Sequence, residues 1–491
     1  MFFAGIDLGT SAVKILAMDE AGEVKHIVSR SYSLHLPRPG WSEQDPSDWY
    51  EKTCDALREL TQVIDPASIG GVSFSGQMHG LVSLDADDSV IRPAILWNDG
   101  RSEKETNYLN DVIGRDNLIS YTSNIAFPGF TAPKLLWMRE HEPDLFGRIA
   151  KIMLPKDYLI YRFTGIHATD YSDAAGSLLL DVPRKEWSPD MLNICQITRD
   201  VLPKLYDSAA VVGDLTPQAA RDTGLAEGTP VIAGAADNAA AAIGTGTVGP
   251  DRCNLSLGTS GTIFLSGDSF TARADTPVHL FVHADGGFHL LGCILSAASC
   301  NQWWCEDILS TADYGGETDR IGPAGECDDA LGSNSVFFLP YLMGERCPYN
   351  DPNVRGAFLG LSRGTTRAQM NQAVLEGVSF GMRDCLEAAR NLGADPKSAT
   401  ICGGGAKSAL WRRIMANVLN LPLQTVRSEE GPGYGAAILA AVGAGCFGSV
   451  RDAVTRLVSC GEPISPDPAL SARYETQYQK YRKLYPLLRQ L

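Results

Sequence analysis

The sequence predicts an α/β protein of two similar halves, with a ligand-binding cleft between them. One short phrase, Leu-Gly-Thr-Ser, occurs twice, at residues 8–11 and 257–260. Apolar runs of strand length alternate with segments of helical spacing in both halves, as in α/β proteins. With 491 residues, 44% hydrophobic and 20% charged side chains, the chain is long enough for two large hydrophobic cores.

Each copy of the repeated phrase lies between two apolar runs, so it predicts two strands joined by a tight turn. Glycine lets the backbone approach a ligand closely, and the two hydroxyls join the turn N–H groups in a small nest for phosphate oxygens. One such turn is common, whereas two copies favour a duplicated nucleotide-binding architecture. The predicted phosphate-binding residues are Gly9, Thr10 and Ser11 in the first half and Gly258, Thr259 and Ser260 in the second.

A glycine- and proline-rich stretch at residues 244–250 marks the clearest boundary in the chain. It predicts an N-terminal lobe of residues 1–248 and a C-terminal lobe of residues 249–491. Further predicted elements are a buried strand at residues 229–234 and helices at residues 238–243, 368–386, 410–419 and 469–491.

Charge and composition narrow the classes of partner. The formal charge of −16 offers no basic excess, which argues against nucleic acid and anionic membranes as partners. No apolar run approaches the length of a membrane span, and the N-terminus lacks the basic region of a signal peptide. The twelve cysteines of the chain include no CxxC pair and are expected to be reduced. We therefore expect a cytoplasmic protein with a small-molecule ligand.

Two charged residues flank the first turn. Asp7 follows an apolar strand and precedes Gly9, which suits a carboxylate that holds Mg²⁺ beside a phosphate nest. The alternative is an aspartate that bonds to its own turn. Lys14 either points its charge at the phosphate or is a solvent-facing strand residue.

Asp237 is the candidate general base. It stands between a predicted strand and an alanine-rich helix, where small neighbours leave room for a substrate. There it could accept a proton from an attacking hydroxyl. The alternative for Asp237 and Asn238 is the capping of that helix.

Two further strand ends carry polar clusters. Met78 and His79 follow a strand and a Gly turn, although a single histidine is more often structural. Trp97 precedes Asn98 and Asp99. An indole ring beside hydrogen-bonding side chains suits a sugar-binding site. The alternative is that Asn98 and Asp99 simply form a turn.

A strand that ends in three glycines, residues 403–405, suits close approach of an adenosine, or it is a plain strand-to-helix turn. Several familiar motifs match by letter but lie in the wrong secondary structure, or are missing. Residues 244–249 match GxGxxG but follow a helix, and residues 377–381 match GxSxG inside a helical segment. No Gly-Lys dipeptide exists, so there is no P-loop.

Together these phrases resemble the FGGY carbohydrate kinases over nearly the whole chain, and within that family the branch that acts on xylulose. Family-like segments occur in the family's order, at residues 6–11, 41–46, 76–80, 93–101, 128–134, 154–158, 172–176, 295–300, 344–346 and 403–406. The resemblance implies two actin-like (ribonuclease-H-like) lobes flanking a central cleft. It also implies ATP with Mg²⁺ between the lobes, a homodimer, and phosphorylation of the terminal primary hydroxyl of D-xylulose.

By the same resemblance, Asp237 is the catalytic base and Met78, His79, Trp97 and Asn238 contact the ketose. Asp7 to Ser11 with Lys14 form the first phosphate element, Gly258 to Ser260 form the second, and Gly404, Gly405 and Ala406 form the nucleoside turn. Two departures stand out: Ala235 and Ala236 replace the usual glycines, and residues 344–349 read Gly-Glu-Arg-Cys-Pro-Tyr where the family has Thr and His at the fourth and sixth positions. The alternatives are another sugar or polyol, such as ribulose, fuculose, gluconate or glycerol, and an actin- or Hsp70-like ATPase.

Overall fold

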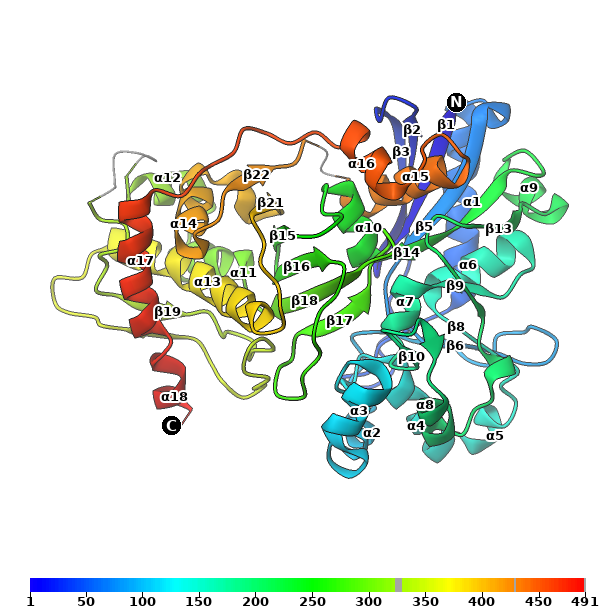
Figure 1. Ribbon diagram of the computed structural model, residues 1–491, viewed down its shortest axis with the longest axis horizontal. Helices are drawn as coiled ribbons and strands as arrows, with labels where there is room; N and C mark the ends of the chain where they lie inside the picture. Colours follow the sequence, from blue (N-terminus) through cyan, green and yellow to red (C-terminus); the bar gives the residue numbers. More distant parts are fainter. Residues whose placement is uncertain (323–328, 428–429, 490–491) are drawn as a thin grey trace.

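Two six-stranded sheets, one in each half of the chain, form the centre of the computed structural model (Figure 1), which describes residues 1–322, 329–427 and 430–489. The first sheet contains β1 (Phe2–Leu8), β2 (Ala12–Asp19), β3 (Val24–Ser31), β5 (Ile69–Gly76), β13 (Val211–Asp214) and β14 (Pro230–Ala236). The second contains β15 (Arg252–Leu257), β16 (Gly261–Gly267), β17 (His279–Val282), β18 (Phe288–Ile294), β21 (Ser398–Cys402) and β22 (Leu423–Thr425).

Five strands of each sheet repeat one topology, and the sixth lies at opposite edges, β13 beside β14 and β17 beside β18. In the first, the order is β13-β14-β5-β1-β2-β3, and β1 pairs antiparallel with β2 but parallel with β5. In the second, the order is β17-β18-β16-β15-β21-β22, and β15 pairs antiparallel with β16 but parallel with β21. Each Gly-Thr-Ser turn therefore closes the central hairpin of its sheet, as the repeated phrase predicts.

Helices cover both faces of the first sheet. On one face lie α1 (Pro46–Val63) and α6 (Pro155–Thr164), whose apolar side chains join the sheet in a core that includes Trp49 and Phe163. On the other lie α10 (Asp237–Gly244) and α15 (Gly431–Gly443). Figure 1 shows that α15 and α16 (Val450–Leu457), from the second half of the sequence, lie beside β1, β2 and β3.

On the second sheet lies α13 (Arg367–Arg390), followed outward by α14 (Ala409–Leu419) and α17 (Pro468–Tyr481). A capping box of Thr366 and Gln369 begins α13. The remaining longer helices are α3 (Arg115–Thr122), α4 (Thr131–His141), α8 (Pro189–Cys195), α9 (Pro217–Thr223) and α12 (Tyr314–Asp319). Shorter elements are β7 (Ala94–Ile95), α2 (Glu103–Asn107), β9 (Ala168–Asp170), α7 (Tyr171–Ala175) and α18 (Leu484–Leu488).

The strand predicted at residues 229–234 is β14, and the helices predicted at residues 238–243, 368–386 and 410–419 are α10, α13 and α14. The prediction of one final helix is wrong, because residues 469–489 form α17 and α18 with a break between them, and residues 490–491 lie outside the described part. Helix α16 was not predicted. Its apolar residues follow helical spacing over only eight residues.

No helix in the described ranges is long and apolar enough to cross a membrane. The cysteines within those ranges are all free, as expected, whereas Cys327 lies outside them.

Candidate active site

Asp7 lies at the end of β1, next to the first Gly-Thr-Ser turn. Its Oδ1 accepts a hydrogen bond of 3.0 Å from Ser75 Oγ on the neighbouring strand β5. No described donor of its own turn bonds to the carboxylate, so the turn-forming alternative receives no support. Burial raises the pKa of Asp7 to about 6. A carboxylate that costs energy to ionise is a good partner for a cation.

The first turn is held from three sides. The N–H of Gly9 donates to the carbonyl of Ala12 at 3.0 Å, and Gln44 Nε2 donates to the Thr10 carbonyl at 2.6 Å. The indole N–H of Trp97 donates to Thr10 Oγ1 at 2.9 Å, while 43% of this residue remains exposed. Trp97 therefore lies on the rim of the first phosphate turn.

The polar residues that follow Trp97 do not all face the site. Asp99 is buried and accepts hydrogen bonds from the Ser42 N–H and from the Arg101 guanidinium. This bonding supports the structural interpretation of Asp99, whereas Trp97 and Asn98 are exposed.

Lys14 is the cross-strand neighbour of Asp7 in the β1–β2 hairpin. Its ammonium lies 3.1 Å from a carboxylate oxygen of Glu430, which precedes α15. Lys14 is thus partly engaged in an ion pair at the edge of the turn, with 44% of its side chain exposed. An exposed pair of this kind contributes about 1 kcal/mol or less, so Lys14 is readily available to an incoming anion.

Asp237 is the first residue of α10 and directly follows β14. Its Oδ1 accepts the N–H of Asn238 at 2.6 Å, so the carboxylate lies at the positive end of the helix. Burial, with a further contribution from the Asp7 charge, raises the pKa of Asp237 to about 7. A carboxylate with that pKa is suited to accept a proton near neutral pH.

Asn238 and Met78 meet beside this carboxylate. Asn238 Nδ2 lies 3.2 Å from the Met78 sulfur, whereas the buried Asn238 Oδ1 has no hydrogen-bond partner among the described residues. An unpaired buried oxygen costs free energy, and a ligand hydroxyl would supply the missing donor.

His79 continues this surface with a left-handed backbone, φ 68°. Its Nδ1 lies 2.6 Å from the Gly176 carbonyl, and its ring is 4.7 Å from that of Phe130 between centroids. Burial, together with the charge of Lys134, lowers the pKa of His79 to about 3, so the imidazole is neutral. The proton belongs on Nδ1, where a carbonyl accepts it, and Nε2 is therefore an acceptor for a ligand hydroxyl.

The backbone of His79 is fixed by a buried lysine that no sequence motif singled out. Lys134 on α4 donates to the carbonyls of His79, at 2.9 Å, and of Gly129, at 2.5 Å. It has no exposed surface, and burial lowers its pKa well below the usual value. Thr131 Oγ1 donates to the same His79 carbonyl at 3.1 Å.

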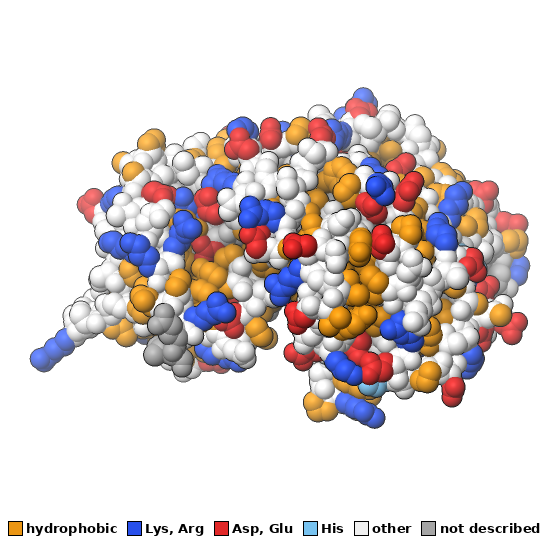
Figure 2. Space-filling model, turned by 60° about the horizontal axis from the view of Figure 1, so that its bottom comes forward, with side chains coloured by type: hydrophobic (Ala, Val, Ile, Leu, Met, Phe, Trp, Pro, Cys, Tyr) orange, Lys and Arg blue, Asp and Glu red, His pale blue; other side chains and the backbone are white. Residues whose placement is uncertain are grey.

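The second turn lines a cavity of about 760 Å³ in the C-terminal lobe. Gly258 and Thr259 from the turn and Gly404 and Gly405 from the glycine triplet contribute to its wall, whereas Ser260 and Ala406 lie outside the lining. A Cβ atom at Gly404 would meet no protein atom within 4 Å, so this backbone faces open space. The cavity has the size of a nucleotide site. Figure 2 shows a notch between the two lobes on the face turned forward.

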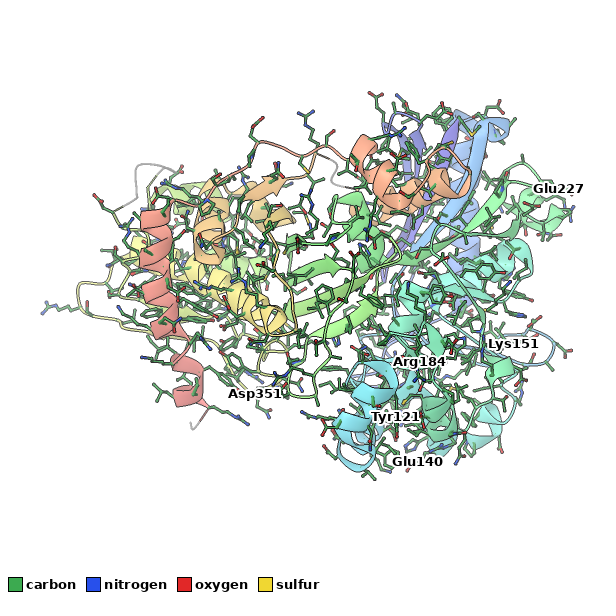
Figure 3. All side chains as sticks on the ribbon, viewed as in Figure 1. Tyr121, Glu140, Lys151, Arg184, Glu227 and Asp351 are labelled. Carbon is green, nitrogen blue, oxygen red and sulfur yellow. The ribbon has the colours of Figure 1, made fainter. Side chains whose placement is uncertain are left out.

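The donor set near Asp7 suits a divalent cation bound largely by phosphate and water oxygens. The two carboxylates, Asp7 and Asp237, interact electrostatically and both have raised pKa values. Mg²⁺ is commonly held by one or two carboxylates and substrate phosphates. In the described residues, the one convergent group of three metal-binding side chains is elsewhere, at Glu105, Glu140 and His141. Figure 3 shows Glu140 at the outer end of the N-terminal lobe.

The two departures from the family pattern have different surroundings. Ala235 and Ala236 are fully buried in β14, so their methyl groups belong to the core below the site. Tyr349 faces away from the cleft: its ring stacks on Tyr485 at 3.7 Å, and its hydroxyl donates to Asp384. Nearby Asp351, labelled in Figure 3, accepts a hydrogen bond from Tyr485, so the loop is tied to the C-terminal helices.

Sequence reasoning missed the residues that support the site. Ser75, Lys134 and Gly176 bond directly to Asp7 or His79, and Ser172 bonds to the backbone beside Asp237. Lys134, Ser172 and Gly176 lie in segments that carry the family resemblance, residues 128–134 and 172–176. Membership in these segments was the one sequence feature that could have identified them.

Comparison with known proteins agrees with this architecture. Residues 2–244 match the N-terminal domain of the FGGY family of carbohydrate kinases, and residues 253–444 match its C-terminal domain. The chain is 39% identical to a xylulose kinase of Escherichia coli strain K12, over 99% of both proteins. It superposes on a xylulose kinase from Brucella ovis with a TM-score of 0.92 and 39% identity, over 100% of this chain and 99% of that one. A gluconate kinase from Lactobacillus acidophilus gives a TM-score of 0.91 and 28% identity, over 99% and 98% of the two chains. The predicted fold of two actin-like lobes is thereby confirmed, and the chain belongs to the FGGY family of carbohydrate kinases.

Proposed function

We propose that the protein transfers the γ-phosphoryl group of ATP to the terminal primary hydroxyl of D-xylulose, giving D-xylulose 5-phosphate and ADP. The observation that carries the proposal is Asp237, a carboxylate with a pKa of about 7 beside Asn238, Met78 and the Asp7 turn. The choice of ketose rests on the near-full-length similarity to xylulose kinases.

Asp237 is the general base of the proposed reaction. Its carboxylate takes the proton of the terminal hydroxyl, that oxygen forms a bond to the γ-phosphorus, and the bond to the ADP oxygen breaks. Because the base acts in its ionised form, we expect kcat to fall as the pH drops below about 7.

The ketose is held by groups that surround this carboxylate. Neutral His79 accepts a sugar hydroxyl at Nε2, and Asn238 Oδ1 accepts another. Met78 gives an apolar contact, and Trp97 closes the side toward the first turn. In this proposal, the acceptor hydroxyl lies between the base and the two Gly-Thr-Ser turns.

ATP is bound by both lobes. The turn at residues 9–11, Lys14, Gly258 and Thr259 contact its phosphates, and Gly404 and Gly405 contact its nucleoside. Asp7 would hold Mg²⁺, which supplies charge neutralisation and alignment of the phosphates. Closure of the lobes over the notch excludes water, which would otherwise compete as the acceptor.

The proposal extends to assembly and location: a homodimer in the cytoplasm. Size-exclusion chromatography with light scattering tests the assembly, since the chain mass is 52.8 kDa and a dimer doubles it.

A second candidate is the same chemistry on an aldonic acid, which the structural similarity to a gluconate kinase favours. The test is ADP release from Mg·ATP with D-xylulose, L-xylulose, D-ribulose, L-ribulose, gluconate, glycerol or no sugar. The highest kcat/KM with D-xylulose supports the proposal. The highest kcat/KM with gluconate supports the second candidate instead. A rate of ADP release that is the same with and without each sugar contradicts both candidates.

The role of the base is tested by Asp237→Asn. We expect kcat to fall at least about 100-fold, because the amide is isosteric but cannot accept the proton. Binding of ATP and ketose, measured by calorimetry, is expected to persist. A kcat close to that of the wild type would remove Asp237 from the mechanism.

A further inference from the structure

A buried cluster of charges lies directly below Asp237. Lys156 on α6 forms ion pairs with Asp157 at 2.8 Å, Asp170 at 2.9 Å and Asp173 at 3.5 Å, and none of the four side chains is exposed to solvent. Lys156 and Asp157 belong to the family-like segment at residues 154–158, Asp173 belongs to the one at residues 172–176, and Asp170 lies just before the latter. The proposed chemistry gives none of these four residues a role.

The hydrogen bonds show which carboxylate of the cluster connects it to the strand before Asp237. Asp170 Oδ2 accepts three donors: the Ser172 N–H at 2.9 Å, Ser172 Oγ at 2.5 Å and Ser208 Oγ at 2.8 Å. Among the described residues, Asp173 has no hydrogen-bond donor at either oxygen, and burial raises its pKa well above the usual value. The partner of Lys156 whose hydrogen bonds lead toward β14 is therefore Asp170.

From Asp170 the hydrogen bonds continue to the catalytic strand. Ser172 Oγ, which donates to Asp170, accepts the N–H of Ala236 at 3.0 Å. Ala236 is the last residue of β14, and Asp237 follows it. A hydroxyl that donates to a buried carboxylate becomes a stronger acceptor, so the peptide next to Asp237 is held by a charge-assisted chain.

We propose that Ser172 is a positioning residue for phosphoryl transfer: it links the Lys156–Asp170 ion pair to the Ala236 N–H and so fixes the carboxylate of Asp237 against the acceptor hydroxyl. This inference rests on the proposed role of Asp237 as general base. Small displacements of a reacting group cost large factors in rate, whereas binding of either substrate does not depend on this bond.

The test compares Ser172→Ala with Ser208→Ala. Both changes remove one buried hydroxyl from Asp170 Oδ2, but only Ser172→Ala leaves the Ala236 N–H without an acceptor. We expect Ser172→Ala to lower kcat at least tenfold, with the KM values for ketose and ATP within twofold of wild type. We expect Ser208→Ala to keep kcat within about threefold of wild type. Equal kcat values for the two variants would overturn the proposal.

A double variant separates this inference from the proposed function. If Ser172 acts through Asp237, Ser172→Ala has no further effect on kcat in the Asp237→Asn protein. An undiminished tenfold effect in that background overturns the positioning role. High activity of Asp237→Asn alone instead contradicts the proposed base, whatever Ser172 does. If Ser172→Ala does not fold, Ser172→Cys provides the same comparison, and wild-type kcat in that variant counts against the proposal.

Discussion

The imidazole of His79 enters the cleft with a fixed tautomer and no charge. Its Nδ1 proton is committed to the Gly176 carbonyl, and burial keeps its pKa at about 3. Its backbone carbonyl is held by Lys134 and Thr131, so the ring has little freedom to turn. The other ring nitrogen, Nε2, is the atom that we propose accepts a hydroxyl group of the substrate.

We therefore expect His79→Ala to raise the KM for the ketose about tenfold, the value of one good hydrogen bond, while the KM for ATP stays unchanged. Steady-state kinetics with each substrate varied in turn measures both. An equal rise in the two KM values would indicate a general disturbance of the cleft instead of a lost sugar contact.

At the scale of elements, the helices of the C-terminal lobe are joined by buried carboxyl groups. Glu376 on α13 accepts hydrogen bonds from Gln372 Nε2 at 2.8 Å and from the Tyr474 hydroxyl of α17 at 2.9 Å. Burial raises the pKa of Glu376 to about 7. The folded state therefore keeps a proton that the unfolded chain releases, since the ordinary pKa of a glutamate is 4.5.

The sign of the pH effect follows from that difference. The contribution of Glu376 to stability is complete below pH 4.5 and is lost as the pH rises through about 7. Glutamine mimics the protonated acid, so Glu376→Gln should match wild-type stability at pH 5 and exceed it at pH 8, by about 3 kcal/mol at most.

Thermal unfolding of both proteins at the two pH values measures this. Glu387→Gln, at a half-exposed position of the same helix, is the control for loss of one negative charge. Equal Tm values of wild type and Glu376→Gln at pH 8 would contradict the prediction.

At the scale of the whole molecule, the N-terminal lobe is completed by a helix from the other half of the chain. Helix α15 packs on β1 and α10 so closely that a Cβ at Gly435 would lie 1.8 Å from the Ala240 carbonyl oxygen. Another at Gly5 would lie 2.1 Å from the Gly433 carbonyl oxygen. The position of α10, and with it that of Asp237, depends on this contact.

Gly435→Ala should consequently lower stability by about 1–3 kcal/mol or more, because α10 and α15 must separate to admit the methyl group. It should also lower kcat, since Asp237 begins α10. Gly448→Ala is the control, because a Cβ there meets nothing within 4 Å. Urea unfolding and steady-state kinetics of the two variants test this, and a Gly435→Ala protein as stable and active as the control would refute it.

The local sequence determined the strands on either side of each Gly-Thr-Ser turn, strand β14, helices α10, α13 and α14, and the candidate residues Asp7, His79 and Asp237. These features depend on neighbours along the chain: the period of apolar residues, glycine at turns and small residues around a carboxylate. The family resemblance supplied the two-lobed fold and the roles, which single motifs did not distinguish from turns and caps.

Only the tertiary structure decided which distant residues support those candidates. Ser75 reaches Asp7 across 68 positions, Lys134 reaches His79 across 55, and Ser172 reaches Ala236 across 64. It also decided that Asp99 is structural and that α15 joins the first lobe. Burial sets the pKa values of Asp237 and His79, and the pattern along the chain did not predict the burial of these two polar side chains. That property arises when remote segments pack together and exclude water.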